Sequence, residues 1–376
     1  MKILAFNWQD IRNPQAGGAE VQFHEVFSRV AQAGHEVVLY CSAFPGAPHE
    51  EMLNGIRVVR EGGRSLFNYR VPLAYANRFR REGFDVVVDD MNKIPFFTPL
   101  FVREPIQGLI HHLFAKSIFR EVNPLVGAYV YFMERIALAL YRRKKTPFIV
   151  VSPSTFDDLV SRGFEPSQLV HIGLAVDHSL FRPTGEPRSP TPLIGYFGRL
   201  KKYKSVDHLL RALPSVLAEF PDLKAIIVGE GDDRPRLEAL TRELKLQDAV
   251  AFTGYVSDQE KVRLLQRMWF KVATSSKEGW GLTVTEANAC GTPAIASDVP
   301  GLRDAVQDGK TGLLYRYGDI SDLAGKIERL TADSELRARL SAGALAWAAL
   351  FVWDEAARRT IDILKQRMAG ARAGAR

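Results

Sequence analysis

The chain has 376 residues, of which 46% are hydrophobic and 25% are charged. This balance is typical of a globular protein, and the length is enough for two domains that each bury a core. The net charge of +7 comes from 50 Lys and Arg against 43 Asp and Glu. The charge is too diffuse to indicate nucleic-acid binding, but it suits a phosphate-bearing ligand or an anionic membrane surface.

Cysteine usage and the N-terminus indicate the cellular compartment. The two cysteines, Cys41 and Cys290, form no paired motif, so the sequence predicts neither a disulfide framework nor a cysteine metal site. The first six residues read as a strand, and the apolar region of a signal peptide is missing there. No apolar run is long enough to span a bilayer. We therefore expect a cytoplasmic protein.

The first half of the chain alternates short apolar segments with helical ones. A strand at residues 2–8 leads through a loop into a helix at 19–33. Further strands are expected at residues 36–41, 56–60, 84–89, 106–111 and 148–152. Such alternation predicts a mostly parallel sheet, whose ligands gather at the carboxyl ends of the strands.

A Pro-rich segment at residues 182–192 is the best candidate for a domain boundary. After it, strands are expected at 193–197, 225–228, 250–253, 270–274, 294–297 and 312–315. The predicted class is α/β, with one Rossmann-like domain at residues 1–185 and a second at 186–352. We expect residues 353–376 to form a helix that returns to the first domain and ends in a frayed tail.

Residues 275–286 form a Gly-rich loop between a predicted strand and a predicted helix. That arrangement directs backbone N–H groups and a positive helix end at an anion, and Gly279 and Gly281 allow close approach. Glu278 and Glu286 bracket the loop. Carboxylates suit hydroxyl groups and not phosphate, so the pair predicts a ligand with sugar rings on both sides of a diphosphate. The alternative is a structural loop with two surface glutamates.

Glu278 and Glu286, separated by seven residues around a Gly-Trp-Gly-Leu core, resemble a known motif. It is the motif of family 4 of the retaining nucleotide-sugar glycosyltransferases, which is related to sucrose synthase and the mannosyltransferases. The resemblance covers nearly the whole chain. It implies the GT-B fold, in which two Rossmann-like domains face each other across a cleft. The first domain would be on the acceptor side, and the second would bind the nucleotide sugar.

The resemblance also implies a clamp for the diphosphate. Arg199 and Lys204 follow the first strand of the second domain, as the paired cations of the family do. Two fixed cations can stabilise the charge on a leaving nucleoside diphosphate without a metal. Ser205 stands where the family usually has Gly. The alternative is a solvated basic loop, because Lys201 and Lys202 share the stretch.

Other donor contacts follow from the resemblance alone. Glu286 would take the ribose hydroxyls, backbone near Val256 together with Lys261 would meet the base, and Glu278 would be catalytic. Amides near the helix start and a Gly-rich loop in the first domain would approach the phosphates; these residues are Gly281, Leu282, Thr283, Gly17 and Gly18.

The resemblance also implies a histidine near the reaction centre, at the end of the strand at 106–111. By register it is His111, with His112 as the fallback. Asp90 and Asn92 end another strand and are predicted to touch the acceptor. The adjacent pair of Asp89 and Asp90 could hold a divalent metal, but the spacing differs from the Asp-x-Asp of metal-dependent transferases. We therefore expect no metal site.

These observations predict a retaining, metal-independent glycosyltransferase of the hexosyltransferase type. The donor would be UDP- or GDP-linked, and the acceptor a hydroxyl of a glycan, a lipid-linked sugar or another glycoconjugate precursor. No separate cofactor is expected. One alternative is a nucleotide-sugar epimerase on a similar fold, which would convert the donor without an acceptor. Another is a non-catalytic nucleotide- or glycan-binding protein, which would leave the donor intact.

Residues 123–141 are almost all apolar or aromatic and are followed by Arg-Arg-Lys-Lys at 142–145. A buried helix with a solvated basic end would explain this composition. An interfacial helix that docks on anionic lipid would explain the aromatic residues and the charge cluster together. In that case the protein would be peripheral at the inner face of the membrane.

Overall fold

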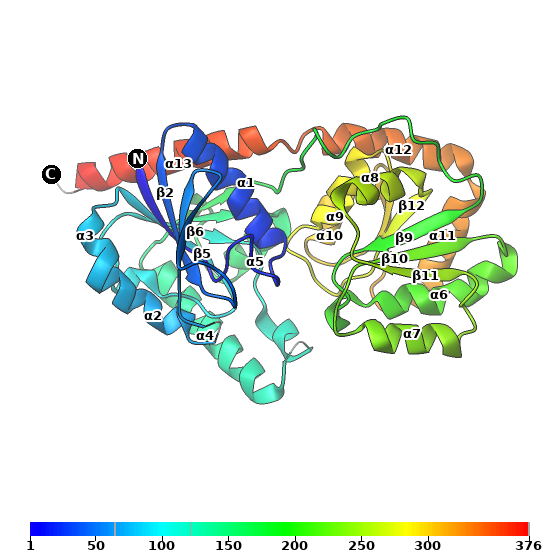
Figure 1. The fold of residues 1–376 in the computed structure, drawn as a ribbon, viewed down its shortest axis with the longest axis horizontal. Helices are drawn as coiled ribbons and strands as arrows, with labels where there is room; N and C mark the ends of the chain where they lie inside the picture. Colours follow the sequence, from blue (N-terminus) through cyan, green and yellow to red (C-terminus); the bar gives the residue numbers. More distant parts are fainter. Residues whose placement is uncertain (64, 121, 375–376) are drawn as a thin grey trace. The chain divides into compact units, whose positions relative to one another are not determined.

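The computed structural model of the chain describes residues 1–63, 65–120 and 122–374. These residues form two compact units, Met1–Leu174 together with the segment from Trp353, and Ala175–Val352 (Figure 1). Each unit is a parallel or mostly parallel sheet covered by helices, so the predicted α/β class is confirmed. The cleft between the two domains stays a prediction.

The sheet of the first unit has the strand order β3-β4-β2-β1-β5-β6-β7-β8, and β3 alone among its described strands pairs antiparallel. The strands are β1 (Lys2–Phe6), β2 (Glu36–Ser42), β3 (Glu50–Leu53), β4 (Ile56–Glu61), β5 (Val86–Met91), β6 (Ile106–Ile110), β7 (Phe148–Val150) and β8 (Leu169–His171). The sequence did not predict β3 and β8. They are edge strands of four and three residues, too short to show a periodic pattern.

Helices cover both faces of this sheet. The helical segments are α1 (Gly18–Gln32), α2 (Phe67–Ala74), a π-helical turn η1 (Tyr75–Phe79), α3 (Arg80–Glu82), η2 (Thr98–Leu100), η3 (Ala115–Arg120), α4 (Pro124–Arg143), α5 (Pro153–Ser161), η4 (Pro166–Gln168) and α13 (Trp353–Gly374). Leu4 and Val87 face α2, whereas α13 packs beside α1 and over β5 and β6. The stretch expected to fray from residue 369 is helical as far as Gly374, and residues 375 and 376 lie outside the described part.

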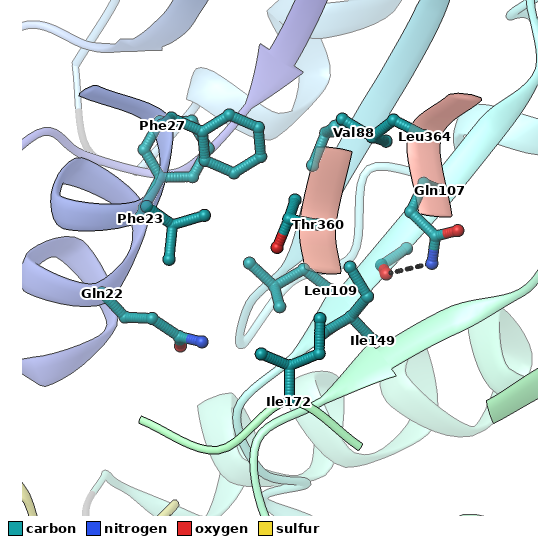
Figure 2. A pocket seen from close by; sticks show the side chains of 12 residues that line it. Gln22, Phe23, Phe27, Val88, Gln107, Leu109, Ile149, Ile172, Thr360 and Leu364 are labelled. Carbon is teal, nitrogen blue, oxygen red and sulfur yellow. Dashed lines mark hydrogen bonds between the residues drawn. The ribbon is translucent and has the colours of Figure 1, made fainter. Parts of the chain in front are cut away.

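A small cavity of about 20 Å³ lies between α1, α13 and the central strands of the first unit (Figure 2). Phe23 and Phe27 of α1, Leu109 of β6 and Leu364 of α13 line it. The volume is on the order of one water molecule, and the lining is mainly apolar. The cavity is a packing gap in the core and lies away from the predicted site residues.

The sheet of the second unit has the order β11-β10-β9-β12-β13-β14 and is parallel throughout its described strands. The strands are β9 (Leu193–Phe197), β10 (Lys224–Val228), β11 (Val250–Gly254), β12 (Phe270–Ala273), β13 (Ala294–Ser297) and β14 (Gly312–Tyr315). The helical segments are η5 (Lys202–Lys204), α6 (Val206–Glu219), α7 (Arg234–Glu243), α8 (Asp258–Arg267), α9 (Leu282–Ala289), α10 (Leu302–Ala305), α11 (Ile320–Ala332) and α12 (Ser334–Ala348). Residues on opposite faces of β9 enter different cores. Ile194 packs with α6 and α11, and Leu193 with α8 and α9.

The division between the units falls after Leu174, earlier than the predicted boundary at residue 185. Phe181 is buried in the core of the second unit. The Pro-rich segment is also fastened to that unit, because Ser189 donates to the Arg267 carbonyl over 2.9 Å and accepts a bond of 2.8 Å from the Trp269 indole. The Pro-rich segment is therefore bound to the surface of the second unit and does not mark the boundary between the units.

Candidate functional site

In the loop after β12, Gly281 adopts a conformation that favours glycine, and Trp280 anchors the loop. Gly281 caps α9 with φ of 110°, a conformation that side chains disfavour. The Trp280 indole is buried and donates to Thr285 Oγ1 over 2.8 Å. The N–H groups of Leu282 and Thr283 lie in the first turn, where an α-helix has no carbonyl to offer them. The loop therefore presents backbone donors and a positive helix end in a fixed place.

Lys204 and Glu278 form an ion pair across this loop, although they are far apart in the sequence. Ser275 Oγ donates to the same carboxylate over 2.6 Å. Burial alone would raise the pKa of Glu278, but the Lys204 charge and these hydrogen bonds hold it below its ordinary value. Burial would lower the pKa of Lys204, and Glu278 instead raises it. Both groups are therefore charged at neutral pH.

Arg199 lies in the same segment as Lys204, between β9 and α6. Its guanidinium donates to the Tyr203 hydroxyl over 3.3 Å. Ser205 has φ of 48°, in the left-handed region that favours glycine, which explains why glycine suits this position. Ser205 holds the conformation that α6 needs at its start, and both predicted cations are in the segment just before it.

Lys261 of α8 and Glu286 of α9 also meet, with Nζ 2.6 Å from Oε2. Glu286 is buried, and the Lys261 ammonium lies 5.1 Å from the centre of the Phe181 ring. Val256 packs at the edge of the same core. The second unit thus brings together Arg199, Lys204, Val256, Lys261, Glu278, Gly281, Leu282, Thr283 and Glu286 through two ion pairs and one helix start.

The first unit has a separate cluster at the carboxyl ends of β1, β5 and β6. His111 Nε2 lies 3.3 Å from Asp90 Oδ1, and Asn7 Nδ2 donates to the other oxygen of Asp90 over 2.8 Å. Gly17 is the N-cap of α1, and its N–H donates to Glu20 Oε2 over 2.7 Å. Gly17 and Gly18 therefore lie at the start of α1, which begins one residue earlier than predicted, and their approach to a phosphate stays a prediction. The buried Glu20 adds a further negative charge near His111.

His111, and not His112, is the histidine in this cluster. Burial would lower the pKa of His111, but Asp90 raises it above the ordinary value. His112 instead packs its ring on Phe114, with ring centres 4.5 Å apart. Asn92 accepts a bond from the N–H of Lys93, so its side chain caps its own turn. Of the acceptor-side candidates, the structure joins Asp90 to His111, while His112 and Asn92 have local partners.

Asp89 and Asp90 point to different partners and do not form a paired site. Asp89 is fully buried and accepts bonds from the Thr98 and Tyr141 hydroxyls. Burial raises the pKa of Asp89 to about 6, against the lowering effect of those two bonds. Across the described residues, no group of three or more His, Cys, Asp or Glu is arranged to hold a metal ion.

Sequence reasoning missed several members of both clusters. Asn7 and Glu20 were not singled out, although Asn7 follows a strand and the Gly17-x-x-Glu20 spacing resembles a capping box. Ser275 and Lys271 were also missed. An ionisable side chain in an otherwise apolar strand was the available signal for Lys271.

Solved structures share this fold over the whole chain. Sucrose-phosphate synthase from Thermosynechococcus elongatus matches with a TM-score of 0.82 and 22% identity, covering 98% of this chain and 99% of that one. The Anabaena protein HepE, solved with UDP and glucose, matches with a TM-score of 0.77 and 19% identity, covering 97% and 100%. At these identities the likeness shows the fold alone, which is the GT-B fold of glycosyltransferases.

Family models match both units. The model of glycosyl transferases group 1 matches residues 179–347, and that of Glycosyltransferase Family 4 matches residues 16–180. The chain therefore belongs to this family of glycosyltransferases, and the predicted resemblance is confirmed. The D-inositol 3-phosphate glycosyltransferase of a Nocardioides species is 34% identical over an alignment of 232 residues, which covers 55% of this chain and 50% of that protein. The chain thus spans about half the length of the curated relatives it matches.

Proposed function

We propose that this protein is a retaining glycosyltransferase that moves a hexose from a UDP- or GDP-linked donor to an acceptor hydroxyl, without a metal. The acceptor would be a glycan, a lipid-linked sugar or another glycoconjugate precursor. The observation that carries this proposal is the partly buried ion pair of Lys204 and Glu278 beside the start of α9. The family, and relatives named as inositol-phosphate glycosyltransferases, support a sugar-transfer reaction.

The second unit would bind the donor and stabilise the leaving group. Arg199, Lys204 and the first-turn amides of α9 would hold the diphosphate, whose negative charge grows as the glycosidic bond breaks. Glu278, kept ionised by its neighbours, would hold a hydroxyl of the sugar and offset positive charge on its ring. Glu286 and Lys261 would contact the nucleoside.

Retention follows from where the proton would go. An inverting enzyme needs a base on the face opposite the leaving group. Glu278 is already bonded to Lys204 and Ser275 beside the Gly-rich loop at residues 275–286, so it is poorly suited to act as that base. The departing phosphate would instead take the proton of the acceptor hydroxyl on its own face. His111, polarised by Asp90, is our candidate for contact with sugar hydroxyls from the first unit.

A screen of nucleotide sugars by thermal shift would first identify the donor, because a bound ligand raises the melting temperature. NMR of the anomeric proton then reports the stereochemistry, and an inverted product would overturn retention. Glu278→Gln should lower turnover about a hundredfold or more, with a much smaller change in nucleotide affinity. Glu230→Gln is the matched control, because Glu230 is a half-exposed carboxylate of the same unit paired with Arg234. Unchanged turnover in Glu278→Gln would refute the role of Glu278.

The same reactions separate the alternatives. An epimerase would convert the donor sugar with no acceptor present, and a binding protein would shift the melting temperature and leave the donor intact. Transfer that requires an acceptor excludes both.

We also propose that one helix face of the first unit docks on anionic lipid. Leu125, Tyr129, Phe132 and Ile136 are spaced along one face of α4, and all are exposed. The Tyr129 hydroxyl contacts that of Tyr69 on α2, so the two helices lie side by side there. None of the helices in the described residues has the length and apolar character to cross a membrane. A stripe of exposed apolar side chains is what an interfacial helix inserts into the headgroup region.

The basic end of α4 would strengthen this docking. Arg142 donates to the Arg162 carbonyl over 3.0 Å and Lys145 lies 3.2 Å from Glu165, whereas Arg143 and Lys144 are exposed. Each charge near an anionic surface contributes on the order of 1 kcal/mol.

Co-sedimentation with vesicles tests the docking. Binding to vesicles rich in phosphatidylserine should weaken with salt, with Phe132→Asp and with the double change Arg143→Gln and Lys144→Gln. Leu350→Asp alters an exposed leucine of the second unit and should leave binding unchanged. Equal binding to neutral and anionic vesicles, or no effect of Phe132→Asp, would refute the proposal.

A further inference from the structure

Lys271 is a lysine in the centre of a buried strand. It lies on β12, where it pairs with Gly195 of β9 and Ala294 of β13, and its exposed fraction is 1%. Its neighbours Phe270 and Val272 are fully buried. Burial of an ammonium group without a partner costs several kcal/mol, so such a lysine calls for a reason.

The charges around Lys271 are already paired with each other. Lys204 is paired with Glu278, and Lys261 of α8 is paired with Glu286 of α9. Among the described residues, no carboxylate lies within ion-pair distance of Lys271 Nζ. The Tyr196 ring is next to it, with its centre 6.0 Å away. The cluster therefore contains two carboxylates and three ammonium groups, and Lys271 is the unpaired one.

This arrangement makes the charge of Lys271 easily changed. Burial, together with the positive charge of Lys204, lowers the pKa of Lys271 to about 7, while Glu278 and Glu286 act in the opposite direction. A pKa in this range means that a change in the surrounding charge can add or remove the proton of Lys271 near neutral pH. When Lys271 is deprotonated, the ammonium groups of Lys204 and Lys261 balance the carboxylates of Glu278 and Glu286.

We propose that Lys271 takes up a proton when the donor's diphosphate binds beside Lys204, and so acts as the counter-ion that balances the added charge. This inference deepens the proposed function and rests on it. Each phosphate brings a negative charge to a partly buried cluster in which both carboxylates are already balanced by Lys204 and Lys261. Arg199 supplies one cation, and Lys271 is the one buried amine of the cluster left without a carboxylate partner. At low effective dielectric, a negative charge strongly favours the protonated form of a nearby amine.

Lys271 is in this sense a positioning residue, which acts through the charge of the cluster. On binding, Lys204 would turn from Glu278 to the diphosphate. Protonated Lys271 would then keep Glu278 ionised, because the charge of Lys271 already lowers the pKa of Glu278. The sign follows from linkage. The pKa of Lys271 is higher in the bound state than in the free state, so affinity is highest below pH 7. Affinity falls as the pH rises above 7, until the pKa of the bound state is reached.

Calorimetry of the whole chain with UDP, and with GDP in parallel, tests the inference. Titrations at pH 8 in Tris and in HEPES, whose ionisation enthalpies differ, report the number of protons taken up on binding. Wild type should take up close to one proton per site, and its affinity should fall by up to about tenfold per pH unit above pH 7.5. At these pH values the nucleotide's own phosphates are already ionised.

Three variants isolate Lys271 from a merely structural role. Lys271→Met should bind with no proton uptake and with affinity independent of pH. Lys271→Arg keeps a permanent cation, so it should also bind without proton uptake, and it covers the case in which the methionine variant fails to fold. Lys310→Met changes an exposed lysine of the same unit and should behave as wild type.

Each outcome has one meaning. Equal proton uptake in wild type and in Lys271→Arg would overturn the assignment to Lys271. Binding of UDP or GDP to wild type without proton uptake would refute the inference and leave the proposed function standing. Failure of both nucleotides to bind wild type at millimolar concentration would instead refute the proposed function, and the inference would fall with it.

Discussion

Gly301 packs against the backbone of Glu278, and its replacement by alanine is the sharpest test of the geometry of the Gly-rich loop at residues 275–286. Gly301 has φ of 84°, and a Cβ placed there would lie 2.3 Å from the Glu278 carbonyl oxygen and 2.7 Å from its carbonyl carbon. The two loops are also joined by a bond of 3.3 Å from the Glu278 N–H to the Pro300 carbonyl. A methyl group at Gly301 must therefore displace the backbone that carries Glu278.

Two effects of Gly301→Ala can be separated by size. Gly301 has φ of 84° and ψ of −50°, a sparsely populated conformation that alone costs an alanine roughly 1–3 kcal/mol. Relief of the contact with Glu278 requires a further shift of about 1 Å, since carbon and oxygen atoms normally stay beyond 3 Å. A displacement of that size at a catalytic group costs about a hundredfold in rate. Gly318→Ala is the matched control, because Gly318 has φ of 88° and open space around its Cβ.

Both variants should lose a few degrees of melting temperature from the strain of a positive φ, and Gly301→Ala should lose more because its methyl group also meets Glu278. Only Gly301→Ala should also lose about a hundredfold in turnover, measured as sugar transfer by NMR with the donor found in the screen. Equal turnover in Gly301→Ala and Gly318→Ala would refute the view that the Gly301 contact sets the position of Glu278.

Three further predictions concern other parts of the molecule. The pKa of Asp89 is about 6 in the folded state and 3.8 ordinarily, so the free energy of unfolding should fall by about 2 kcal/mol as the pH rises from 4 to 6. Urea unfolding should show that Asp89→Asn removes this part of the pH dependence; an unchanged pH profile would contradict it. Trp280→Phe loses the bond to Thr285, and its melting temperature should fall by an amount equivalent to about 1 kcal/mol; an unchanged value would show that the indole does not anchor the loop. Transfer should persist in excess EDTA, and a loss restored by Mn²⁺ or Mg²⁺ would show that a metal is required.

All strands of the two units except β3 and β8 could be predicted, because each of them is a short apolar run bounded by turn residues. β9, β13 and β14 have the predicted bounds, and most other central strands differ by a residue or two at an end. The Pro-rich segment led to a predicted domain boundary that lies too late in the chain. Composition does not reveal that Ser189 and Trp269 fasten this segment to the second unit. An attachment of this kind is visible only through its tertiary contacts.

The sequence predicted the site residues that belong to a recognisable motif. It did not predict the residues whose role depends on their burial in the folded protein. The motif identified Lys204 and Glu278, which then meet in the structure. No pattern indicated that Asn7 would hold Asp90, because that contact joins two strand ends. In α4 the apolar residues surround the helix, so periodicity alone could not show that Phe132 is exposed and Leu138 buried.

The placement of α13 affects the order in which the chain can fold during synthesis. The second unit is one continuous segment and can fold as soon as Val352 has left the ribosome. The first unit receives α13, with its buried Ala356, Thr360 and Leu364, only after the whole second unit has been made. Until then the apolar surface of α1, β5 and β6 is uncovered. The nascent first unit is therefore the part of this protein that most needs protection from aggregation.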